Sequence, residues 1–287
     1  MTAPKARAAD WTEERGTSDE GSRRVQARRR CKASRAEWTK LRTVPGTGWL
    51  LLGVAALTAG LGVLADAATR CPAGVCHLDP AKTSLIGVDL SQAVVAILAV
   101  LVISGEYGTG LIRVTLTAMP RRTTMLAAKA VTVTGLTLVA GAVGVAGSVL
   151  AGRLILPGHG FAFGHGYPPL SLADGPVLRA AAGSVLYLAL IALFSLGVGT
   201  AVRDAAAAMG IVLGLLYLVP IIASTVTDPG WHRHLEQLAP MTAGLTIQDT
   251  IGLPGLAISP WAGLGVLAAW AAGALLLGGL LLRLRDA

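Results

Sequence analysis

The chain has 287 residues, of which 53% are hydrophobic and only 14% are charged. A soluble domain carries roughly 25% charged residues, because its surface must face water. The composition therefore excludes a soluble globular enzyme and predicts a membrane protein.

Apolar runs of about 20 residues are long enough to cross the ~30 Å hydrocarbon layer of a bilayer as helices. The runs in this chain are continuously apolar and rich in Leu and Ala, whereas membrane strands alternate between apolar and polar residues. The second run is the shortest and requires tilt or local thinning of the bilayer. We predict an all-α, polytopic membrane protein with six transmembrane helices, at residues 48–65, 88–104, 130–150, 180–202, 205–226 and 261–282.

The distribution of Lys and Arg predicts the orientation, because cytoplasmic loops carry an excess of these residues. With six spans both termini share one side, and that side holds nineteen of the 24 Lys and Arg residues. Without the nine basic residues that precede Ser34, the ratio is still ten to five. We predict that both termini are cytoplasmic, and that the basic balance reflects topology rather than binding of nucleic acid.

The N-terminal region divides into two parts. Residues 1–33 have almost no large apolar side chains and cannot bury a core, which predicts a disordered basic cytoplasmic tail. Contact of this tail with anionic lipid head groups is favoured over binding of nucleic acid. In residues 34–44, Trp38 and Leu41 share one helical face and basic residues occupy another. This pattern predicts either an N-terminal interfacial helix or a plain basic flank before the first span.

Two connections on the predicted external side have features of their own. Cys71 and Cys76 lie together in the first, where a disulfide persists, whereas Cys31 lies on the reducing side. A disulfide between Cys71 and Cys76 and a pair of free thiols both remain open. Residues 227–260 include a semi-apolar stretch that is too short to span, which predicts a re-entrant or membrane-skimming segment.

Glycines recur at helical spacing inside the predicted spans. Small residues let membrane helices approach closely, so we predict that these glycines serve helix packing. They are Gly141, Gly144, Gly147, Gly210, Gly214, Gly273 and Gly279.

Several kinds of chemistry are missing from the sequence. No Lys follows a Gly, which excludes the GxxxxGK[ST] phosphate loop, and neither HExxH nor GxSxG occurs. Asp66, Asp89 and Glu106 lie at span ends, where water is expected to reach them. Ion-coupled carriers usually need a buried ionisable group. We therefore predict neither a self-powered secondary transporter nor an intramembrane acid–base enzyme, and no metal or cofactor.

The most structured polar segment is the connection after the second span. Its stretch LIRVTLTAM favours a short helix that Pro120 ends, followed by Arg121 and Arg122. So much local character suggests a docking surface. A plain basic connector, which would only satisfy the orientation rule, is the alternative.

Three stretches resemble a known family: SRAEWTKLRT before the first span, GEYGTGLIRVTLTAMPRRTTMLAAKA after the second, and PWAGLGVLAAWAAGALLLGGLLLRLRDA at the end. They resemble the permease subunits of type-2 ATP-binding-cassette (ABC) transporters, in the small six-span form of high-GC bacteria. The middle stretch is the most specific, because its Glu-Tyr, Thr-Gly, Pro-Arg-Arg and Ala-Ala-Lys elements keep the family's order. The resemblance covers residues 34–287, which would form the permease domain, and leaves 1–33 without a counterpart.

The resemblance implies a permease in the bacterial cell membrane that exports an amphipathic drug, peptide or lipid. A second permease copy or paralogue and a separate cytoplasmic ATPase subunit would complete the assembly, and ATP would bind to that subunit only. By position, the family's interfacial helix would include Glu37, Trp38, Lys40, Leu41 and Arg42, and the 227–260 loop would match its external re-entrant element. The segment that contacts the ATPase, which we call the coupling segment, would include Glu106, Tyr107, Gly110, Arg113, Pro120, Arg121 and Arg122.

Two other classes of function remain open. A membrane-embedded enzyme acting on lipid or peptide would need a polar cluster at one membrane face, for which Asp66, Asp89 and His77 are the candidates. A membrane anchor or sensor would use its basic tail to bind a partner. The identity of the cargo does not follow from the sequence.

Overall fold

The computed structural model describes residues 45–71, 78–108, 122–161 and 170–284. Over these ranges the chain is helical and contains no strand. Six of the described helices are long and apolar enough to cross a membrane, and each contains most or all of one predicted span, so the six-helix prediction is confirmed. They are Gly48–Ala68, Gly87–Gly105, Thr124–His159, Gly175–Val202, Ala205–Thr225 and Pro260–Leu282.

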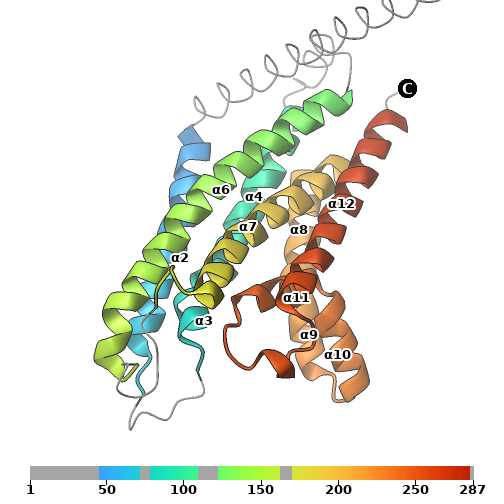
Figure 1. Ribbon diagram of the computed structural model, residues 1–287. Coiled ribbons are helices and arrows are strands. Elements are labelled where there is room, and N and C mark those ends of the chain that lie inside the picture. Colours follow the sequence, from blue (N-terminus) through green and yellow to red (C-terminus); the bar gives the residue numbers. More distant parts are fainter. Residues whose placement is uncertain (1–44, 72–77, 109–121, 162–169, 285–287) are drawn as a thin grey trace, which may run out of the picture.

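The long helices form an up-and-down bundle (Figure 1). They are α2 (Pro45–Ala68), α4 (Gly87–Gly108), α6 (Arg122–Ile155), α7 (Gly175–Val202) and α12 (Pro260–Leu284), together with a fifth span made of α8 (Ala205–Leu213), η4 (Gly214–Leu218) and α9 (Val219–Thr225). Helix α7 is central, because it packs against α4, α6, α8 and α12 and is buried along most of its length.

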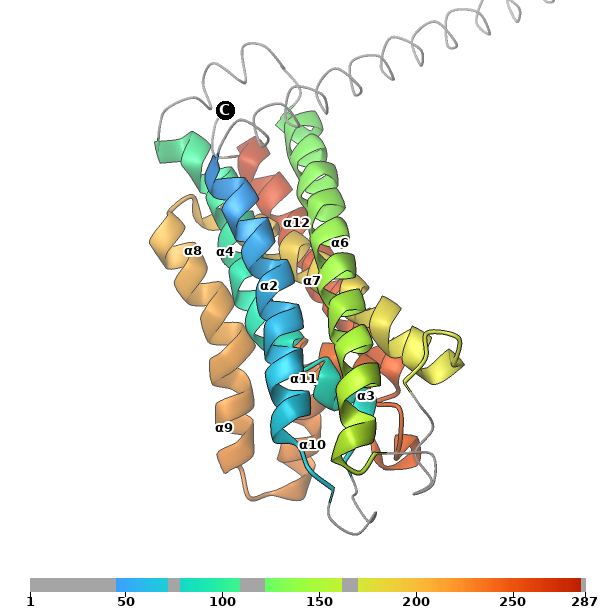
Figure 2. The same ribbon diagram turned by 90° about the vertical axis from the view of Figure 1, so that its left-hand side faces the viewer.

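The two ends of the bundle differ in what they hold. The start of α2, the end of α4, the start of α6 and the end of α12 lie at one end, here called the terminal end (Figure 2). The opposite end, here called the capped end, holds the short elements α3 (Pro80–Ser84), η2 (Leu156–His159), α10 (Pro229–Leu238), α11 (Pro240–Leu245), η5 (Thr246–Gln248) and η6 (Leu253–Gly255). Within the described ranges, the connections at the capped end thus contain short helices and turns of their own.

The fifth span is interrupted in its middle by a π-helical turn, η4. Pro220 follows this turn and has no N–H with which to donate a helical hydrogen bond, so the regular ladder cannot pass through it unchanged. The turn carries Tyr217, whose hydroxyl donates to the backbone oxygen of Asp89 in α4. A single-turn π-bulge of this kind is often found at functional sites.

The predicted role of glycine in helix packing is confirmed for α6. A Cβ on Gly144 would lie 2.8 Å from the Cβ of Thr58, and one on Gly147 would lie 3.1 Å from the Cβ of Ala59, both in α2. A Cβ on Gly141 would lie 3.3 Å from Leu188 of α7. These glycines let α6 approach two neighbours at van der Waals distance.

Gly210, Gly214 and Gly273 serve no close helix packing among the described residues of the chain, because an added Cβ at these positions would meet nothing within 4 Å. Gly279 shows only an ordinary contact. The reason is that helical spacing identifies a common face but not whether that face points inward. The closest approach of α7 and α12 uses two other glycines, Gly197 and Gly278, where a Cβ would lie 2.5 Å and 2.7 Å from backbone atoms of the facing helix.

Candidate functional site

The predicted coupling segment joins two helices at the terminal end. Glu106 and Tyr107 belong to the last turn of α4, and Arg122 is the first residue of α6. Gly110, Arg113, Pro120 and Arg121 lie outside the described residues, as do all five residues predicted for the interfacial helix (Glu37, Trp38, Lys40, Leu41 and Arg42). The coupling role of the segment therefore stays a prediction.

Cys71 is buried and disulfide-bonded. Its predicted partner, Cys76, lies outside the described residues, so the Cys71–Cys76 pairing stays a prediction. The backbone N–H of Cys71 donates to the oxygen of His159 at 2.8 Å, and the side chain packs with Leu156 and Phe161. This small cluster fixes the end of α2 against the end of α6.

Helix α4 starts deep inside the bundle rather than at its capped end. Gly87 packs directly on the backbone of Thr58, and the hydroxyls of Ser91 and Thr58 are 2.7 Å apart. Thr58 lies ten residues before Ala68, the last residue of α2. At a rise of roughly 1.5 Å per residue, α4 begins about 15 Å inward from the end of α2.

The chain reaches this inner starting point through α3, which folds back along α2 and α6. Gly62 of α2 packs against the backbone oxygen of Ser84, and the Ser84 hydroxyl donates to Oδ1 of Asp66 at 2.9 Å. Gly152 of α6 lies against the same pair. The second predicted span is the shortest because α3 occupies the remaining depth of the bundle beside it.

This fold-back corrects one expectation drawn from the sequence. Asp66 was expected to be within reach of water, but its relative exposure is 0%. Asp89 is partly buried, and its Oδ1 atom is buried with no hydrogen-bond partner in the described part of the chain. Position at the end of an apolar run does not imply exposure when the following loop returns into the bundle.

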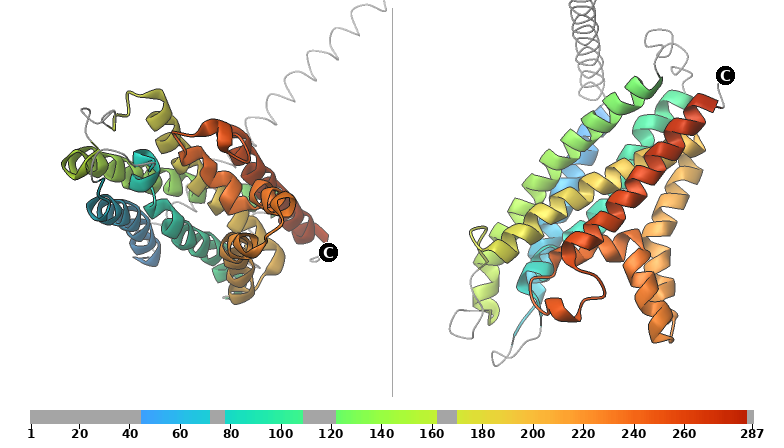
Figure 3. Two further views of the ribbon diagram at one scale, coloured as in Figure 1. Left: turned by 90° about the horizontal axis from the view of Figure 1, so that it is seen from below. Right: turned by 45° about the vertical axis from the view of Figure 1, so that its right-hand side comes forward.

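A second segment also folds inward at the capped end. Helix α11 and the turn η5 pack between α7 and α12, with Ile247 fully buried against Gly183. An added Cβ on Gly244 would lie 2.6 Å from the ring of Tyr187. In the view from the capped end, α3 and α11 both lie among the long helices (left panel of Figure 3). Part of residues 227–260 thus folds between two long helices. The re-entrant or membrane-skimming character of this segment stays a prediction.

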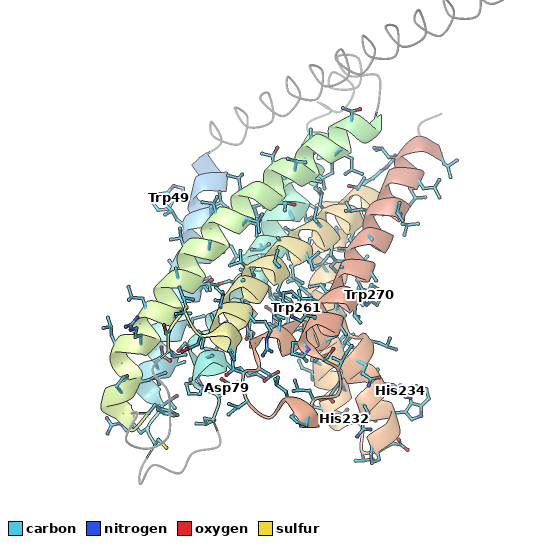
Figure 4. The ribbon with its side chains drawn as sticks, in the orientation of Figure 1. Trp49, Asp79, His232, His234, Trp261 and Trp270 are labelled. Carbon is cyan, nitrogen blue, oxygen red and sulfur yellow. The ribbon has the colours of Figure 1, made fainter. Side chains whose placement is uncertain are left out.

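The two inward segments meet through a set of polar contacts that we call the clasp, formed by Asp79, Lys82, Asp249 and Thr250. Asp79 caps α3, and its carboxylate also accepts hydrogen bonds from the backbone N–H and the hydroxyl of Thr250. The N–H of Ile251 donates to the same carboxylate at 3.1 Å. Lys82 Nζ lies 2.7 Å from Asp249 Oδ1. Figure 4 labels Asp79 at the capped end, close to α3.

Further inside lies a group of hydrogen-bonded polar side chains that we call the inner polar layer. The Tyr187 hydroxyl donates to Oε1 of Gln92, and Gln92 Nε2 donates to the backbone oxygen of Asp89 at 3.0 Å. Tyr217 donates to the same backbone oxygen. Burial of polar groups is costly unless they are hydrogen-bonded, and these contacts satisfy the tyrosine and glutamine groups. Gln248 donates to Ser184 at 3.1 Å. The layer comprises the backbone oxygen of Asp89 and the side chains of Gln92, Ser184, Tyr187, Tyr217 and Gln248.

The polar groups of the clasp and the inner polar layer can bind a ligand through hydrogen bonds and charge. Within the described ranges, no group of three or more His, Cys, Asp or Glu side chains is placed to hold a metal ion. The carboxylate of Asp66 accepts a hydrogen bond from Ser84, whereas Asp89 contacts the inner polar layer through its backbone oxygen, so the two residues share no hydrogen-bond partner. His77, the third residue considered for an enzymatic cluster, lies outside the described residues.

Lys129 is a buried ionisable residue that was not predicted from the sequence. It is only 2% exposed, and its Nζ donates to the backbone oxygen of Val102 in α4 at 2.9 Å. The third predicted span begins at residue 130, but α6 begins at Arg122, so that Lys129 lies well inside a helix. A lysine directly before an apolar run is usually exposed at the membrane interface.

The inner polar layer is easier to recognise in the sequence, because Gln92 and Tyr187 are polar residues that interrupt apolar runs.

The clasp makes unequal contributions to stability. Asp79→Ala removes a helix cap and leaves two backbone N–H groups of residues 250 and 251 without their acceptor, so we expect a loss of about 2–4 kcal/mol. Lys82 is 52% exposed in its side chain, so we expect Lys82→Ala to cost about 0.2–1 kcal/mol. Thermal unfolding of both variants in a mild detergent measures the difference. Equal small shifts would contradict the central position of Asp79.

No model of a known protein family matches the chain, and a search of curated proteins finds no match either.

Proposed function

We propose that this chain is the membrane-spanning permease subunit of an ABC transporter of the bacterial cell membrane. A separate cytoplasmic subunit would bind and hydrolyse ATP, and a second permease copy or paralogue would complete the translocation path. The cargo would be an amphipathic molecule that is exported. The absence of a phosphate loop from the sequence is consistent with a motor on another chain.

The observation that supports this proposal is that the start of α2, the end of α4, the start of α6 and the end of α12, which adjoin the three family-like stretches in the sequence, lie at one end of the bundle. The first stretch precedes α2, the second runs from the end of α4 into α6, and the third forms α12 and the residues that follow it. Each stretch is joined to a helix end at the terminal end. An ATPase that docks on the cytoplasmic face would contact the connections at this end, as the resemblance implies.

The proposed orientation follows from the same geometry and from the basic residues. The terminal end would face the cytoplasm, because the connections there hold most of the Lys and Arg residues. The capped end, with its disulfide-bonded Cys71, would face the oxidising exterior. The inward-folded α11 and η5 would then be the external re-entrant element of the family.

A carrier driven by an ion gradient is a second candidate function. It is favoured by Asp66 and Lys129, which are almost fully buried ionisable groups inside membrane-length helices. Groups of this kind are costly in a membrane and often mark ion or proton pathways. The lack of a clear ionisable residue had argued against this class at the level of the sequence, and that argument no longer holds.

One purification separates these candidates. The chain is isolated from its native membrane in a mild detergent, and its partners are identified by mass spectrometry. We expect a soluble subunit with a phosphate loop to copurify, no ATP hydrolysis by the chain alone, and ATP-driven transport only after both are reconstituted. Transport by proteoliposomes that contain the chain alone and an imposed proton gradient would instead support the carrier. ATP hydrolysis by the purified chain itself would refute the permease assignment.

A further inference from the structure

The carboxylate of Asp89 lies in an unusual position for a membrane helix. It belongs to the first turn of α4, which starts about 15 Å inward from the end of α2. Its Oδ1 atom is buried and has no hydrogen-bond partner among the described residues. A negative group with an unused acceptor is therefore present beside the inner polar layer.

Two other carboxylates of the capped end, Asp79 and Asp249, have their charge matched by partners. Asp79 accepts hydrogen bonds from several N–H groups, and Asp249 pairs with Lys82 at 2.7 Å. Lys82 also interacts electrostatically with Asp89, but its Nζ is committed to Asp249. Arg179 donates to the backbone oxygen of Asp249. Asp66 and Asp89 each keep a buried carboxylate oxygen without a partner among the described residues, but Asp66 is fully buried whereas Asp89 is partly exposed and can be reached by a ligand.

Stability of the fold does not account for this carboxylate. The helix dipole favours a negative charge in the first turn of a helix. The buried Oδ1 atom nevertheless loses its contact with water, and no donor among the described residues replaces that contact. An ionisable group of this kind inside a membrane-length helix is usually functional.

The surroundings of Asp89 indicate the kind of cation. Tyr217 lies close to this turn, because its hydroxyl donates to the backbone oxygen of Asp89. A tyrosine ring can attract a cation. The next residue on each of these elements, Leu90 and Leu218, is an exposed apolar side chain. A carboxylate beside an aromatic ring, bordered by apolar surface, is complementary to a molecule with a positive charge and an apolar body.

We infer that Asp89 and Tyr217 form a binding subsite for the charged group of an amphipathic organic cation, an alkylated ammonium or phosphonium. The inference rests on the proposed transport function, because it specifies the charge of the cargo. It predicts that cationic cargo is selected over anionic cargo of the same size and shape. Inner-layer residues Gln92 and Tyr187 position the start of α4 around this subsite.

The probe is tetraphenylphosphonium, and tetraphenylborate is its control, since the two ions have nearly the same shape and opposite charge. Binding to the purified full-length chain is measured by equilibrium dialysis in a non-ionic detergent at mildly alkaline pH. We expect saturable binding of the cation only. Asp89→Asn should weaken it at least tenfold, and Asp89→Glu should retain most of it. Asp174→Asn, which removes the same charge from an exposed position at the capped end, should leave it unchanged.

A second measurement avoids any dependence on the folding of variants. A hydrophobic carbodiimide modifies carboxyl groups inside membrane proteins, and mass spectrometry identifies the modified residue. We expect tetraphenylphosphonium to protect Asp89 in the unaltered chain, and tetraphenylborate to give no protection. Absence of saturable cation binding, equal binding by Asp89→Asn, or equal protection by both ions would overturn the inference.

These outcomes are distinct from those that test the transporter assignment. The binding experiment uses the chain alone, so it succeeds or fails without an ATPase partner. Copurification of an ATPase together with no cation binding would retain the permease and reject the subsite. Cation binding without an ATPase would retain the subsite and favour the gradient-driven carrier.

Discussion

Gly263→Ala is expected to destabilise the bundle by about 2–4 kcal/mol, and Gly265→Ala is expected to have no harmful effect. A Cβ on Gly263 would overlap the backbone oxygen of Ala243 and lie 2.5 Å from the hydroxyl of Thr246. Overpacking of this kind typically costs about 1–3 kcal/mol and occasionally more. Because the obstacle is backbone, it can be relieved only when α11 moves away from α12.

Gly265 provides a matched control on the same helix. An added Cβ there would meet nothing within 4 Å, so alanine should only improve helix formation, by about 0.5–1 kcal/mol. Both variants are compared with the unaltered chain by thermal unfolding in detergent and by the yield of monodisperse protein. If the two variants unfold at the same temperature, α11 does not pack against the start of α12 as described.

Glu106→Ala and Arg121→Glu are expected to abolish transport in the reconstituted complex while leaving membrane insertion and yield near normal. Glu106 lies in the last turn of α4, and Arg121 directly precedes α6, so both flank the connection at the terminal end. A single exposed ion pair contributes roughly 0.2–1 kcal/mol, so its loss should not unfold the protein. A small displacement of a coupling element, however, can disconnect the conformational step from ATP hydrolysis.

Arg153→Glu serves as the control, because it makes the same change of charge at an exposed position near the opposite end of α6. We expect this variant to transport normally. Cargo-stimulated ATP hydrolysis and binding of the ATPase subunit are measured alongside transport. Normal transport by both Glu106→Ala and Arg121→Glu would leave the plain connector as the better interpretation of residues 109–121.

The spans could be predicted from the sequence because hydrophobicity over about 20 residues is a local property. The inward turn of α3 could not, because it depends on distant contacts. Its residues are polar and rich in turn formers, which is typical of an external loop. Only the close approach of Gly62 to Ser84 and of Gly87 to Thr58 brings the segment inside the bundle.

The candidate site shows the same division. Gln92 and Tyr187 stand out in the sequence as polar residues within apolar runs, yet nothing local indicates that the Tyr187 hydroxyl reaches Gln92, 95 residues away. Lys129 was missed because its charge suggested a residue at the membrane surface. Burial of its ammonium group depends on the position of Val102 on another helix.

The clasp also has a consequence for the biogenesis of the protein. Asp79 and Thr250 are 171 residues apart, so a ribosome that has completed the first four spans has not yet supplied the donors for Asp79. The chain emerges at about 5–20 residues per second, so this carboxylate and Lys82 remain without their partners for roughly ten seconds or more. During this interval the capped end of the nascent bundle has unpaired charged groups. We expect membrane chaperones and quality-control proteases to bind this intermediate. The clasp forms only after α11 and the residues that follow it have packed into the bundle, and its formation completes the capped end.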